Sequence, residues 1–128
     1  MLLGKTLVAL RKSDDVERIA SFLNRINERP HLLFAMLDFR DIADSRVMSF
    51  DHSNPDDFLG NLNGYEFEVS RIPYRADKMP ARVFLEEAIK RRCDNIIVVS
   101  AGTDALFHAD LASTLAAESS IPVLVIHG

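Results

Sequence analysis

Short apolar runs alternate with segments of helical periodicity along most of this chain, and this order restricts the fold more than any other feature. The runs cover residues 5–11, 31–39, 95–100 and 122–126. Their apolar side chains occupy successive positions, as in strands that are covered on both faces. Strands that alternate with helices predict a parallel sheet with right-handed crossovers. We therefore expect one α/β domain over residues 1–128.

Three segments show the spacing of amphipathic helices. The first follows the capping residues Ser13-Asp14-Asp15 and reaches Ile26, the second covers residues 80–92, and the third covers roughly residues 104–118. In the second helix one side is expected to be buried and the other exposed. The expected buried side holds Val83, Phe84, Ala88 and Ile89, and the expected exposed side holds Glu86, Glu87, Lys90 and Arg91.

The middle of the chain is less regular. Residues 65–72 alternate apolar with polar side chains, which predicts a third strand at an edge of the sheet. Residues 40–64 are rich in turn formers, so we expect at most a short helix near residues 55–62. This stretch is either a lid or a long connection.

Composition excludes several classes of protein. With 48% hydrophobic and 27% charged residues, and no run near the roughly 18 apolar residues that span a bilayer, we expect a soluble protein without membrane insertion. Lys5 interrupts any secretory signal, and Cys93 is a single cysteine, so we expect a cytoplasmic protein without an internal disulfide. The formal net charge of -4 disfavours a nucleic acid partner.

No residue pattern predicts catalysis or a metal site. The histidines His31, His52, His108 and His127 have no spacing typical of metal ligands. Cys93 lacks a neighbouring base and is expected to be a packed side chain, and Ser100 lacks the setting of a nucleophile elbow. We expect a protein that is not an enzyme and has no metal or other cofactor.

The segment from Cys93 to Gly128, CDNIIVVSAGTDALFHADLASTLAAESSIPVLVIHG, resembles the universal stress protein family. In that family an Asp-containing turn, an IIV strand, a small-residue loop and a helix precede a closing PVLVV-type strand. The opening KTLVALRKSDDVERIASFL is similar to the family's first strand, loop and helix. The resemblance covers about residues 5–39 and 65–127. It implies a three-layer sandwich, adenine nucleotide alpha hydrolase-like or Rossmann-like, with a five-stranded parallel sheet of order 3-2-1-4-5.

This strand order implies a ligand crevice where the chain reverses direction, between strands 1 and 4. The residues expected around the crevice are Arg11, Lys12, Ser13, Asp38, Ser100, Gly102 and Thr103. Several of them have a structural alternative. Arg11 either binds an anion or pairs with Asp104 or Asp14, Ser13 either binds a ligand or caps a helix, and Asp38 either faces the ligand or bonds local amides.

The loop after residue 100 departs from the ATP-binding motif of the family. That motif has a glycine, two residues, a second glycine, nine residues, and then a glycine before serine or threonine. Starting at Ser100 places Thr103 and Ser113-Thr114 at the later positions, so all three glycines are missing. Counting back from Pro122 places Ala109-Asp110 at the last pair, with an acidic side chain toward a phosphate. We expect weak or absent ATP binding.

The last strand predicts self-association. Val123, Leu124, Val125 and Ile126 are all apolar, and the strand order puts them at a sheet edge that needs cover. The resemblance implies a homodimer through this strand. The leading hypothesis is a dimeric, non-enzymatic stress-response or regulatory domain. The alternatives are a nucleotide binder that uses Arg11, Lys12 and the loop from Ser100 to Thr103, and a regulatory domain cut from a transporter or sensor kinase.

Overall fold

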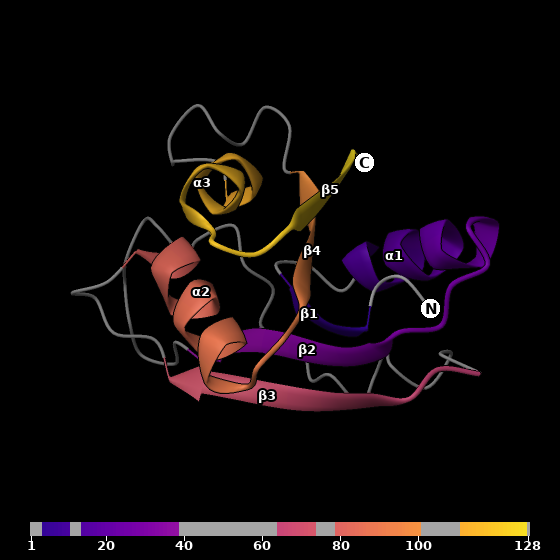
Figure 1. Ribbon diagram of the computed structural model, residues 1–128, viewed down its shortest axis with the longest axis horizontal. Helices are drawn as coiled ribbons and strands as arrows, with labels where there is room; N and C mark the ends of the chain where they lie inside the picture. Colours follow the sequence, from indigo (N-terminus) through magenta and orange to yellow (C-terminus); the bar gives the residue numbers. More distant parts are fainter. Residues whose placement is uncertain (1–3, 11–13, 39–63, 74–78, 101–110, 128) are drawn as a thin grey trace.

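The computed structural model of this protein describes residues 4–10, 14–38, 64–73, 79–100 and 111–127, which form a parallel sheet with helices on both faces (Figure 1). The strands are β1 (Lys5–Ala9), β2 (His31–Asp38), β3 (Phe67–Pro73), β4 (Asn95–Ser100) and β5 (Val123–His127). The helices are α1 (Asp14–Arg25), α2 (Pro80–Lys90) and α3 (Leu111–Glu118). The strands are ordered β3-β2-β1-β4-β5, and every neighbouring pair is parallel. The predicted fold and strand order are confirmed.

Two apolar cores lie on opposite faces of the sheet. The α1-side core is built from Val8, Leu10, Val16, Ile19, Leu23, Leu32, Phe34, Ile97, Val99 and Ile126. The α2/α3-side core uses the alternate positions of the same strands together with α2 and α3, including Leu7, Leu33, Phe84, Ile96, Val98 and Leu115. Phe34 and Phe84 are fully buried, one in each core. Burial of side chains of this size stabilises the fold by about 1.5–3 kcal/mol each.

Helix ends are fixed by backbone geometry. Asn27, just after α1, adopts a left-handed conformation with φ 57°, and the Glu28 N–H donates to the Leu23 carbonyl at 3.0 Å. α2 starts with Pro80, which is favoured in the first helical turn because no intrahelical donor is lost there. At its end Arg92 has φ 56° and the Cys93 N–H donates to the Ala88 carbonyl at 2.9 Å. These left-handed residues end α1 and α2 and let the chain turn toward β2 and β4.

The expected sides of α2 need a correction. Glu87 was expected to be exposed but is buried, and Ile89 was expected to be buried but is 66% exposed. The side of α2 that carries Glu87 faces β3, where the Ser70 hydroxyl donates to the Glu87 carboxylate. A buried carboxylate is tolerated when it is hydrogen-bonded and paired. The polar partner on β3 makes the burial of Glu87 possible, and a helical pattern alone cannot reveal it.

Element boundaries differ slightly from the sequence expectations. β1 ends at Ala9, and the third strand covers Phe67–Pro73 at a sheet edge, as expected. α3 begins at Leu111 within the described residues, and the expected short helix at residues 55–62 lies outside them. In the described part of the chain, no helix is long and apolar enough to cross a membrane.

Candidate functional site

The strand order places a switch point between β1 and β4. α1 follows β1 and covers one face, whereas α3 follows β4 and covers the other face (Figure 1). The chain therefore leaves the carboxyl ends of these two neighbouring strands in opposite directions. In open parallel sheets a ligand crevice forms at such a point. The topology confirms the switch point between β1 and β4, and the crevice expected there stays a prediction.

Two of the predicted crevice residues have a described backbone at this end of the sheet. Ser100 is the last residue of β4 and is half-buried. Asp38 is the last residue of β2, where its backbone is in register with Pro73. Because all five strands are parallel, both residues lie at the carboxyl edge of the sheet. Arg11, Lys12, Ser13, Gly102 and Thr103 lie outside the described residues, as does the expected pair between Arg11 and Asp104.

His127 is a further residue at this edge, and sequence reasoning did not place it there. It ends β5 and is in register with Ser100 on β4. The signal was present in the sequence, because the runs 95–100 and 122–126 are adjacent parallel strands and their ends can be aligned. Among the described residues, no group of histidine, cysteine and carboxylate side chains could hold a metal ion.

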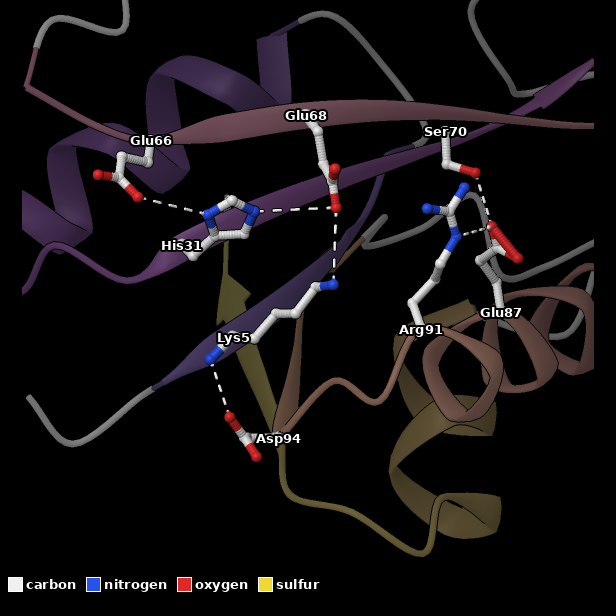
Figure 2. A network of polar contacts seen from close by, with 8 residues as sticks. All are labelled: Lys5, His31, Glu66, Glu68, Ser70, Glu87, Arg91 and Asp94. Atoms are coloured by element: carbon white, nitrogen blue, oxygen red, sulfur yellow. Dashed lines mark hydrogen bonds and ion pairs between the residues drawn. The ribbon is translucent and has the colours of Figure 1, made fainter.

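A polar network occupies the opposite, amino end of the sheet (Figure 2). The Lys5 backbone N–H donates to the Asp94 carboxylate at 2.9 Å, and Lys5 Nζ lies 3.6 Å from Glu68 Oε1. The two ring nitrogens of His31 lie 3.7 Å from Glu66 Oε2 and 3.8 Å from Glu68 Oε1. These contacts join β1, β2 and the start of β3. They lie far from the switch point, since they are at the other end of the strands.

A second part of the network is buried between β3 and α2. The Ser70 hydroxyl donates to Glu87 Oε2 at 2.6 Å, and Arg91 Nε lies 3.5 Å from the same oxygen (Figure 2). Ser70 and Glu87 are 6% and 8% exposed. The serine hydroxyl therefore donates to a carboxylate that is already paired with a guanidinium. This arrangement suits a structural clamp better than an activated nucleophile, which needs a free general base.

Cys93 lies at the end of α2 and is buried. Burial is the main cause that raises the pKa of its thiol above the usual range. Lys5 opposes this shift, whereas Asp94, Glu87 and Glu68 add to it. A thiol with a raised pKa is mostly protonated at neutral pH and reacts slowly. The expectation of a packed cysteine agrees with this burial.

The strand β5 lies at the edge of the sheet, as expected. Its side chains alternate between the two cores: Val123 and Val125 pack against the α2/α3-side core, and Leu124 and Ile126 belong to the α1 side. Ile126 is 9% exposed, and the other three are half-buried. Neither set faces solvent entirely, because both faces of β5 contact the domain's own core.

Comparisons with known proteins give a result at the level of structure alone. No protein-family model matches the sequence, and no curated protein matches it in sequence. A universal stress protein family protein from Arabidopsis thaliana, solved with AMP bound, superposes with a TM-score of 0.64 over 97% of this chain and 91% of that chain, at 17% identity. The chain has the universal stress protein fold.

Two further structures with this fold are similar over nearly their full length. A universal stress protein in complex with cAMP gives a TM-score of 0.57 at 13% identity, over 99% of both chains. The universal stress protein from Archaeoglobus fulgidus in complex with dAMP gives 0.56 at 13% identity, over 97% of both chains. The fold similarity between this chain and these universal stress proteins therefore extends over nearly the whole length of both chains.

Proposed function

We propose that this protein is a non-enzymatic regulatory or stress-response domain that acts as a homodimer and binds ATP weakly or not at all. The observation that carries the proposal is the sequence Ser100-Ala101-Gly102-Thr103-Asp104, which begins at the last residue of β4. A loop at this place binds phosphates through glycines that allow close backbone approach. The glycine motif for ATP is intact in neither register of this loop.

The absence of enzymatic activity is supported by the described polar groups. Ser70 is bonded to a paired carboxylate, and burial raises the pKa of the Cys93 thiol. Neither side chain is prepared as a nucleophile. A regulatory domain needs no such group, since it acts through binding alone.

The homodimer is supported by the edge position of β5 together with its apolar side chains, of which three are half-buried. An uncovered apolar edge strand invites pairing with another chain. A two-fold contact through β5 would bury on the order of 1,200 Å² or more in total. In this proposal one chain pairs with a second copy of itself through β5. The resulting dimer then binds a further protein partner.

One observation favours a second candidate function, in which the crevice binds a nucleotide. Three structures of the same fold contain AMP, cAMP or dAMP, each of which has a single phosphate group. A nucleotide with one phosphate needs fewer backbone donors than ATP does. In this alternative Arg11, Lys12 and the loop from Ser100 to Thr103 would hold the phosphate in place of the glycine motif.

A thermal-shift titration with ATP, ADP, AMP and cAMP, with magnesium, distinguishes the two functions. A ligand at 100 times its dissociation constant stabilises the folded state by about 2.7 kcal/mol. For a domain of this size that corresponds to a melting temperature higher by on the order of 10 °C. We expect millimolar ATP to give a negligible shift. A clear shift with any of the four nucleotides would support the alternative, and Arg11→Asp should then abolish it.

A further inference from the structure

β3 forms the edge of the sheet opposite β5, and within the described residues no strand pairs with its outer side. On the inner side the Leu32 N–H donates to the Glu66 carbonyl at 2.9 Å. In a strand the backbone groups of successive residues alternate between the two sides. Glu66 and Glu68 therefore direct their backbone groups toward β2, whereas Phe67 and Val69 direct theirs toward the open edge.

One face of this edge is apolar from Phe67 to Val69, and the exposed Arg71 is the next residue on it. Phe67 and Val69 are 39% and 37% exposed on the face that carries α1. Tyr65 precedes them on the same face, and its hydroxyl donates to Asn24 of α1 at 2.7 Å. The Phe67 ring meets Phe34 edge-on with ring centroids 5.9 Å apart, which fixes its position. The helix thus reaches the start of β3 and leaves the next two apolar side chains accessible.

The other face of the same edge is acidic. The side chains of Glu66 and Glu68 are 90% and 44% exposed (Figure 2). Lys5 on β1 lies beside Glu68 on the inner side, and the ring of His31 on β2 lies beside both glutamates. The two carboxylates outnumber the one lysine beside them, which contacts Glu68, so the formal charge of this face is negative with histidine counted as neutral. Charged side chains that sit in strand register attract a strand with the opposite charge.

We propose that β3 binds an extended segment of a partner protein as an additional strand, with basic side chains opposite Glu66 and Glu68 and aliphatic side chains opposite Phe67 and Val69. Main-chain hydrogen bonds to the open edge would supply the affinity, and the alternating side chains would supply the specificity. No lysine or proline protects the edge between residues 66 and 70, although natural edges often carry one. Pro73 ends the pairing on the carboxyl side.

A second copy of this chain is a poor occupant of the same edge. Pairing of two β3 strands around a two-fold axis would bring the glutamates of both copies onto one face. Like charges in neighbouring strands destabilise the pair. Charge complementarity therefore favours a basic, alternating segment of another protein, and this interaction does not depend on nucleotide binding.

The test measures fluorescence anisotropy of a labelled Lys-Val-Lys-Val-Lys peptide with the full chain at low ionic strength. We expect saturable binding. A peptide with the same side chains, N-methylated at the amides that face β3, should bind at least about tenfold more weakly, because it cannot form the ladder. Equal binding of the two peptides would overturn the proposal in favour of simple charge attraction, and no binding of the first peptide would overturn it as well.

Protein variants locate the surface. The double variant Glu66→Gln, Glu68→Gln and the variant Val69→Thr should each weaken binding by about tenfold. The matched controls are Glu17→Gln on α1 and Ile89→Thr on α2, both exposed and on helices rather than on the edge strand. Circular dichroism verifies that each variant is folded. Binding that is lost equally in the controls, or a self-association of the unliganded chain that Val69→Thr abolishes, would contradict the proposal.

Discussion

The Ser70 hydroxyl and the Glu87 carboxylate form a buried contact that joins β3 to α2. Ser70→Ala removes the donor and leaves a buried carboxylate beside the Arg91 guanidinium. Loss of a hydrogen bond to a buried charged group costs about 1.5–3 kcal/mol. We expect Ser70→Ala to lower the free energy of unfolding by about 2 kcal/mol in denaturant titrations.

Ser120→Ala, just after α3, is the control for this prediction, since Ser120 is an exposed serine and its loss should change stability by less than about 0.5 kcal/mol. Equal effects of the two substitutions would show that the hydrogen bond contributes nothing specific. The pair Ser70→Ala and Glu87→Gln should also be non-additive, because both changes remove the same interaction.

Cys93 gives the chain a pH-dependent stability at alkaline pH. Burial raises the pKa of the folded-state thiol above its ordinary value of 9.0. A group with a raised folded pKa stabilises the fold fully below its unfolded pKa, and this contribution is lost as the pH rises through the folded value. Between neutral pH and pH values above 9.0, wild type should therefore lose more stability than Cys93→Ala.

Guanidinium unfolding of both proteins at several pH values checks this. Because other groups titrate in both proteins, the difference between them isolates the thiol. Parallel curves for wild type and Cys93→Ala would contradict the assignment. A thiol reagent should likewise react far more slowly with folded than with unfolded protein at neutral pH.

At the scale of the elements, the two edges of the sheet have different chemistry. β5 carries only apolar side chains from Val123 to Ile126, whereas β3 alternates apolar with acidic or polar ones. An apolar strand suits a symmetric contact with its own copy, and an alternating charged strand suits a different partner. The two surfaces can therefore be tested separately.

For β5 the decisive substitution is Val125→Glu. Val125 is half-buried, and a charge at the centre of a dimer contact would be desolvated without a partner. We expect wild type to sediment with twice the chain mass at micromolar concentration and Val125→Glu to give monomer or aggregate. Val69→Glu, at the other edge, should leave the dimer intact. A wild-type protein that stays monomeric at high concentration would show that β5 is not an interface.

Local patterns were sufficient for most of the elements. The apolar runs at residues 31–39 and 95–100 predicted β2 and β4 closely, because strands buried on both faces need little tertiary information. The same reasoning failed for α2, where Glu87 is inside and Ile89 is outside. That orientation depends on Ser70, a residue 17 positions away in the chain.

At the scale of the whole molecule, the strand order followed from the family resemblance rather than from periodicity. Propensity alone finds strands, but it does not order them, since the order depends on contacts between distant segments. Once the order was known, the switch point could be located at the ends of β1 and β4, where the crevice is expected. This reasoning did not predict the register between β4 and β5, in which His127 pairs with Ser100.

The central claim is a homodimeric domain of the universal stress protein fold that does not retain ATP. Native mass spectrometry of freshly purified wild-type protein tests both parts in one spectrum. The account predicts a single species with the mass of two chains and no added mass. A monomer, or a dimer that carries the mass of one adenine nucleotide per chain, would contradict it.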